Sequence, residues 1–200
     1  MNLNDLLSQH LPDELLAQMA GKVGVQDPNV GVAASKSIIN TLMQGLMNNS
    51  SSESGAEGLL GAIDRDHNGS ILDDVLGFLG NSGQSGSDQM TNSAGILGHI
   101  LGFKQQNVTN GVSKVFGMDT STVISLMSML APVVMGLIGK ARANNQVDQT
   151  NIQQVLGTTV HQQTEQNSGL GIFGKLLDTD GDGNISDDLL QMGMKFLLKR

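Results

Sequence analysis

Aspartates gather in two short windows of the sequence, which together hold nine of its 19 acidic residues. Both windows alternate Asp with turn-forming residues, in the sequences Asp64-Arg-Asp-His-Asn-Gly-Ser-Ile and Asp178-Thr-Asp-Gly-Asp-Gly-Asn-Ile. Oxygens from alternating loop positions can converge on one calcium ion, which takes about six to eight oxygen ligands. The sharp turn needs a residue free to adopt positive φ at the sixth position, and Gly69 and Gly183 stand there. Both windows therefore predict calcium loops.

The two loops share a departure from the EF-hand pattern. At the twelfth position, where that pattern has a bidentate Glu, the chain has Val75 and Leu189. Acidic residues stand one and two positions earlier, so they can close the loop if the exit helix begins a turn sooner. The expected ligands are Asp64, Asp66, Asn68, the carbonyl of Ser70 and Asp73 or Asp74 in the first loop, and Asp178, Asp180, Asp182, the carbonyl of Asn184 and Asp187 or Asp188 in the second.

Two alternatives to a calcium loop remain at this point. Magnesium is an alternative ion, and an Asp-rich turn before a helix N-terminus is an alternative structure, because Asp caps helices and interacts well with the helix dipole. The second loop has Asp at its first, third and fifth positions, whereas the first loop has the neutral Asn68 at the fifth. We therefore expect the second loop to bind its ion more tightly.

Residues for catalysis are not assembled in any recognisable pattern. The four His, namely His10, His67, His99 and His161, are each isolated, and no Gly-x-Ser-x-Gly motif is present. The chain has no Cys, which excludes disulfides and thiolate chemistry. We therefore expect a non-catalytic protein, with a hydrolase that uses His99 as the third-ranked alternative.

The net charge of the chain indicates which classes of binding partner to expect. The formal net charge is -8, and the 11 Lys and Arg are scattered. A duplex nucleic-acid binder needs clustered basic residues to displace phosphate counterions, so a nucleic-acid partner is not expected. A protein partner or a homo-oligomer is compatible with the 11 Met, whose flexible side chains serve equally as core filler or as an adaptable surface.

Helical periodicity dominates the sequence, and no long two-residue alternation indicates a sheet. The predicted fold class is all-α, a multihelical bundle. The expected helices cover residues 12–23, 28–46, 55–63, 72–79, 94–101, 107–116, 120–144, 151–166, 170–177 and 187–198.

The order of these helices suggests an internal duplication. Residues 1–80 form an N-terminal half with the first Asp loop, residues 81–93 a Gly- and Ser-rich linker, and residues 94–200 a C-terminal half with the second loop. In each half a short helix ends at a glycine, Gly24 or Gly117, and a longer apolar helix follows. Residues 151–166 are then an insertion in the second copy.

Residues 120–139 carry no charge and are long enough to span a bilayer. Pro132 and three Ser lie within this segment, and Lys140 and Arg142 follow it, so we interpret it as a buried helix kinked or locally unpaired at the proline. No secretory signal is recognised at the N-terminus, and the cytoplasm is the default location, with export by another route left open. A membrane-associated or self-assembling helical protein is the main rival function.

Three segments resemble the bacterial YidB-like family of proteins of unknown function. They are Gly95-Ile-Leu-Gly-His-Ile-Leu-Gly, Leu130-Ala-Pro-Val-Val-Met-Gly-Leu-Ile-Gly-Lys140, and the run from Leu177 to Asp188. The first Asp window is similar to that of longer, two-loop members. The resemblance implies a multihelical fold and implies no activity. From the chemistry of the Asp loops, and not from the resemblance, we expect a calcium-binding structural or interaction module of unknown biological role.

Overall fold

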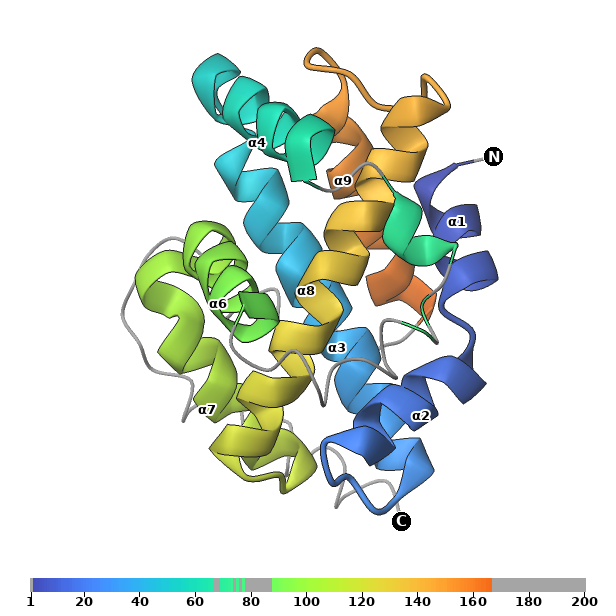
Figure 1. Cartoon of the computed structure of the whole chain (residues 1–200), viewed down its shortest axis with the longest axis vertical. Helices are drawn as coiled ribbons and strands as arrows, with labels where there is room; N and C mark the ends of the chain where they lie inside the picture. Colours follow the sequence, from blue (N-terminus) through green and yellow to red (C-terminus); the bar gives the residue numbers. More distant parts are fainter. Residues whose placement is uncertain (1, 67–68, 74, 76, 78–87, 167–200) are drawn as a thin grey trace.

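Helices form the framework of the protein (Figure 1). The computed structural model describes residues 2–66, 69–73, 75, 77 and 88–166. The elements are α1 (Leu3–His10), α2 (Asp13–Lys22), α3 (Pro28–Asn49), α4 (Glu53–Asp66), the 3-10 turn η1 (Ser70–Leu72), α6 (Asp88–Leu101), the 3-10 turn η2 (Gly102–Lys104), α7 (Gln105–Phe116), α8 (Thr120–Ala143) and α9 (Ile152–Gln166). Every element of the described residues is helical, which confirms the all-α prediction for that part of the chain.

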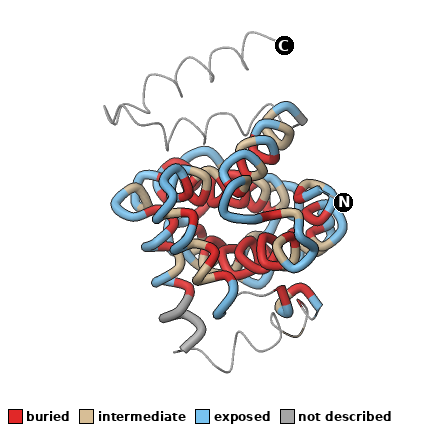
Figure 2. Tube along the Cα trace, turned by 90° about the horizontal axis from the view of Figure 1, so that it is seen from above, coloured by how far each residue is buried: buried red, intermediate tan, exposed pale blue. Residues whose placement is uncertain are grey.

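Helices α3 and α8 cross at the centre and hold the others around them (Figure 1). Helix α8 contacts α1, α2, α3, α4, α6, α7 and η1, and α3 also contacts α9. Leu42, Met43, Leu126 and Leu130 are fully buried between these helices. Figure 2 shows the buried residues where the helices face one another, with exposed residues on the outside. Helices from both predicted halves therefore share one core.

The long apolar helix α8 is mostly buried inside this bundle. Helix α8 is the one described helix that is long and apolar enough to cross a membrane by length and composition. In the bundle, 72% of its most apolar 18-residue window is buried. Pro132 lies inside α8, and the helix continues through it to Ala143. The expectation of a buried core helix agrees with this packing.

Local sequence explains where several helices begin and end. The Asn2 side chain accepts from the Asp5 N–H, and the Asp5 side chain accepts from the Asn2 N–H, a capping box that starts α1. Asp27 accepts from the Asn29 N–H at 2.8 Å and starts α3. Gly117 adopts φ 65° and ends α7, a conformation that favours glycine.

Close approach of two helices occurs where glycine removes a side chain. A Cβ on Gly45 of α3 would lie 2.8 Å from Ile100 Cγ2 and 2.9 Å from the Ile100 carbonyl oxygen of α6. The Asn49 side chain donates to the His99 carbonyl at 2.7 Å and to the Ile100 carbonyl at 3.2 Å. The end of α6 is therefore fixed firmly to the end of α3.

Several expected helix boundaries differ from the structure. Helix α1 precedes the first predicted helix, α4 continues to Asp66 rather than ending at residue 63, and α6 begins at Asp88, inside the predicted linker 81–93. The expected helices 170–177 and 187–198 lie outside the described residues, as do residues 81–87 of the linker.

Candidate functional site

The first Asp loop lies between α4 and η1 and faces the end of α8. Asp64 and Asp66 belong to the last turn of α4, Ser70 opens η1, and Asp73 follows it. Gly69 has φ 96°, so the positive φ predicted for the sixth loop position is confirmed. Asn68 and Asp74 lie outside the described residues, as does the whole second loop with Asp178, Asp180, Asp182, Asn184, Asp187 and Asp188.

Glycines on both sides let the loop backbone lie directly on α8. A Cβ on Gly136 of α8 would come within 2.4 Å of Ile71 Cγ2, so Ile71 occupies the space that a side chain would fill. A Cβ on Gly69 would lie 3.0 Å from the Lys140 backbone nitrogen. Therefore η1 can pack this closely on α8 only because neither of these two positions carries a side chain.

Two cations of α8 hold the two ends of the loop. Arg142 donates from Nε and Nη2 to the two carboxylate oxygens of Asp64, at 2.6 and 2.7 Å. Lys140 Nζ donates to Asp73 Oδ1 at 2.8 Å. We call these two ion pairs the α8 clasp. Its carboxylates are the expected first ligand and one of the two expected closing ligands of the loop.

The α8 clasp keeps both carboxylates ionised. The hydrogen bond from Arg142 lowers the pKa of Asp64, and the hydrogen bond from Lys140 lowers the pKa of Asp73. All four side chains remain partly exposed: 30% for Arg142, 52% for Asp64, 32% for Lys140 and 69% for Asp73. Exposed ion pairs of this kind contribute little to the stability of the fold.

Asp148 contributes a further carboxylate to the recess that Arg142 and Asp64 line. A recess of about 490 Å³ is lined by Ile63, Asp64, Gly139, Arg142, Ala143, Asn145, Val147 and Asp148. Hydrogen bonds from the Thr150 side chain and from the Thr150 and Asn151 backbone lower the pKa of Asp148. The charge of Arg142 acts in the same direction.

Sequence reasoning missed three residues of this site. They are Lys140, Arg142 and Asp148, which meet the loop only through the fold. Among the described residues, no group of three or more His, Cys, Asp or Glu side chains is gathered as for a metal ion. Asp64 and Asp73 are each joined to a cation of α8 instead.

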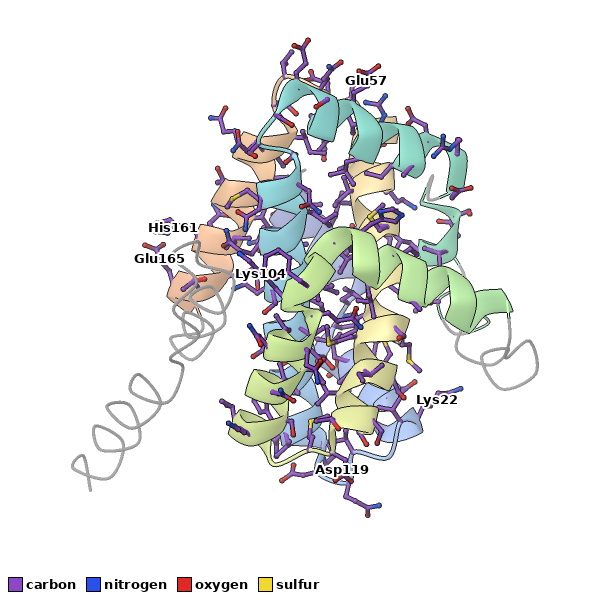
Figure 3. The ribbon with its side chains drawn as sticks, turned by 90° about the vertical axis from the view of Figure 1, so that its left-hand side faces the viewer. Lys22, Glu57, Lys104, Asp119, His161 and Glu165 are labelled. Atoms are coloured by element: carbon purple, nitrogen blue, oxygen red, sulfur yellow. The ribbon has the colours of Figure 1, made fainter. Side chains whose placement is uncertain are left out.

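A groove lies next to the loop, between α4 and α6, and α3 and α8 form its floor. Its volume is about 1050 Å³, and it is lined by Leu46, Asn49, Gly55, Gly58, Leu59, Ala62, Arg65, Asp66, Gly95, Ile96, His99, Ile100 and Met135. Figure 3 shows α4 and α6 crossing the side of the molecule that faces the viewer. His99 is exposed in this groove. Its backbone carbonyl, and not its ring, takes the hydrogen bond from Asn49.

The fold and the loop define an all-α protein whose described part is built around two crossed central helices. Over residues 5–141 the chain matches the family model described as bacterial protein of unknown function (DUF937), and it belongs to that family. The match covers more than half of the chain, from α1 to the last turn of α8. No curated protein and no solved structure matches the chain.

Proposed function

We propose that the protein is a non-catalytic helical module whose Asp loops bind calcium, in a two-loop form of the YidB-like kind. The observation that carries this proposal is the α8 clasp, which holds two of the expected ligands of the first loop as ionised, exposed carboxylates on one side of α8. Calcium binds there by replacing Lys140 and Arg142 as the counter-charge of the loop. Magnesium is the competing ion.

Exchange of the counter-charge is physically reasonable for three reasons. The carboxylates are already ionised at neutral pH, so ion binding releases no proton from them. The ion pairs that must open are exposed and screened. Gly69 already holds the turn that the ligand geometry requires. Calcium therefore exchanges one set of loop contacts for another, and this changes how α4 and η1 are held against α8.

An internal duplication agrees with the backbone. A short helix, a glycine with positive φ and a long central helix occur twice, as α2, Gly24 and α3 and as α7, Gly117 and α8. The two long helices pack against each other. We propose that each copy carries one Asp loop.

We also propose the cytoplasm as the place where the protein works.

Thermal unfolding followed by circular dichroism tests ion binding. Melting curves are recorded in chelator, in excess magnesium and across a calcium titration, for the wild-type chain and for Asp178→Ala/Asp180→Ala, which disables the second loop. A ligand at one hundred times its Kd stabilises the folded state by about 2.7 kcal/mol. We expect a calcium-dependent rise in Tm that is smaller in the double variant. Identical curves in chelator and calcium would show that the chain binds no ion in its folded state.

A second experiment tests whether the α8 clasp competes with calcium for the first loop. It uses the Asp178→Ala/Asp180→Ala variant, in which the second loop is disabled. Lys140→Gln removes the partner of Asp73, and calorimetric titration should then show tighter calcium binding by the first loop. Lys36→Gln is the matched control, because Lys36 pairs with Asp13 at 2.7 Å with closely similar exposure and lies outside the loop. Equal affinities for the two variants would mean that Lys140 does not compete with the ion.

Phe103 favours the second candidate function, which is membrane association or self-assembly. This side chain on η2 is 90% exposed, although it is large and apolar. Co-sedimentation with phosphatidylglycerol vesicles, in chelator and in calcium, tests the membrane form of this function. Binding that persists in chelator and is lost in Phe103→Ser would favour it over the calcium module.

A further inference from the structure

The groove between α4 and α6 has the shape of a seat for a helix. Small residues line its walls, with Gly55, Gly58 and Ala62 on α4 and Gly95 on α6. A Cβ built on Gly58 or Gly95 meets nothing within 4 Å, so these two positions face open space. Glycine and alanine walls let a further helix backbone approach closely.

Apolar side chains of the groove are only half covered. Leu59 of α4 and Ile96 of α6 are half-buried, and both pack against the main core. Met135 lies beneath them in the floor, where its flexible thioether side chain can adapt to an occupant. A helix seated here would extend the core outward between α4 and α6.

We propose that residues 187–198 of the same chain occupy this groove as a helix. This segment lies outside the described residues, and helical periodicity predicts a helix there. Seven of its 12 residues are large and apolar: Leu189, Leu190, Met192, Met194, Phe196, Leu197 and Leu198. A helix with so wide an apolar surface needs protein contact over most of its circumference.

The length of residues 187–198 as a helix fits the length of the groove. The α4 wall runs from Gly55 to Asp66, eleven residues apart, which is about 16 Å along a helix at 1.5 Å per residue. Residues 187–198 are also eleven residues apart from end to end, so their helix has the same length of about 16 Å. The seat and the segment therefore match along the helix axis.

The connecting chain reaches the groove. Helix α9 ends at Gln166, and Figure 3 shows α9, marked by His161 and Glu165, along the edge of the side on which α4 and α6 lie. The 20 residues 167–186 can span up to about 65 Å, whereas a folded chain of 200 residues has a radius of gyration of about 16 Å. Because the segment belongs to the same chain, its effective concentration near the groove is in the millimolar range. A segment of the same chain therefore has an advantage over a separate partner. Asp187 and Asp188, the first residues of the segment, are expected ligands of the second loop, whereas the apolar residues that would contact the groove follow them.

A single tryptophan tests the proposal, because the chain contains no Trp or Tyr. In the full-length Phe196→Trp protein, we expect blue-shifted emission and weak acrylamide quenching. Gly58→Leu or Gly95→Leu fills the groove, and either should shift the emission to the red and increase quenching several-fold. Gly61→Leu and Gly98→Leu are matched controls on the same two helices, since their Cβ atoms also meet nothing within 4 Å and neither residue lines the groove. Solvent-exposed emission in Phe196→Trp alone, or equal emission in filled and control variants, would overturn the proposal.

Cysteine cross-linking gives an independent readout in this cysteine-free chain. Oxidation of full-length Gly58→Cys/Met194→Cys should produce an intramolecular disulfide in a monomeric band on a non-reducing gel. Gly61→Cys/Met194→Cys is the control and should cross-link several-fold less. A dimeric band would assign the groove to a second copy, and equal cross-linking of both pairs would show that the segment does not seat there. Circular dichroism confirms that each variant has the helix content of the parent.

Discussion

Gly136→Ala should uncouple the first Asp loop from α8, and the structure predicts the energy of this change. A new Cβ would lie 2.4 Å from Ile71 Cγ2, a methyl group on a stiff β-branched side chain that cannot swing away freely. Overpacking of this kind costs about 1 to 3 kcal/mol. Replacing glycine by alanine inside a helix gains about 1 kcal/mol. The net expectation is a destabilisation of roughly 0 to 2 kcal/mol.

The sign should reverse when Ile71 is truncated. In an Ile71→Ala background, the nearest remaining atoms to the new Cβ are Leu72 Cγ at 3.7 Å and Gly69 Cα at 3.9 Å, which are ordinary contacts. Gly136→Ala should then stabilise the protein by about 1 kcal/mol, the helix-propensity gain alone. The coupling energy between the two positions is therefore about 1 to 3 kcal/mol.

Urea unfolding followed by far-UV circular dichroism measures these four proteins, and equal m-values confirm that the same surface is exposed in each. Gly61→Ala on α4 is the reference for propensity alone, because its Cβ meets nothing within 4 Å. If Gly136→Ala has the same effect with Ile71 and with Ala at position 71, the loop is not seated on α8 through this contact, and the reasoning is refuted.

Three further predictions concern helix packing, pH and capping. Gly45→Ala should destabilise the protein, and Ile100→Ala should rescue it only in part in urea unfolding, because the Ile100 carbonyl oxygen stays 2.9 Å from the new Cβ; full rescue would contradict this. Because Arg142 lowers the pKa of Asp64, the stabilisation from this pair is present above the unperturbed value of about 3.9 and is lost as pH falls through the lowered value. Melting curves of wild type and Asp64→Asn should therefore differ at neutral pH and converge in acid, and a constant difference would argue against the ion pair. Asp27→Ala removes the cap of α3 and should cost about 1 kcal/mol in urea unfolding, with Asp27→Asn as the conservative control; equal stability of both variants would show that the cap contributes nothing.

Helices with strong local signals could be predicted well from sequence. Helix α8 was expected at residues 120–144 and spans Thr120–Ala143, since a glycine stop precedes it and apolar residues continue through it. Helix α1 has only eight residues, and its start is marked by a capping box of Asn2 and Asp5, a short polar signal that apolar periodicity does not detect. Helix α4 was expected to stop before the aspartates. It continues to Asp66, so Asp64 faces Arg142 from the last helical turn.

The turn of the first Asp loop could be predicted from sequence, whereas the basic partners of its aspartates could not. The positive φ of Gly69 follows from a local turn pattern and was predicted. The partners of Asp64 and Asp73 stand 78 and 67 residues away in the chain, and only the packing of η1 on α8 brings them together. No local pattern contains that information, although two basic residues at the end of a long apolar helix were visible.

The central position of α8 has a consequence for how the protein opens. Since α1, α2, α3, α4, α6, α7 and η1 all contact α8, none of them can detach without exposing part of it. Amide hydrogens in the middle of α8 should therefore exchange with solvent only when the whole bundle unfolds, whereas those at the ends of α1 and α9 exchange through local fraying. Pro132 has no amide hydrogen, so it contributes no exchanging site to this protected middle part of α8.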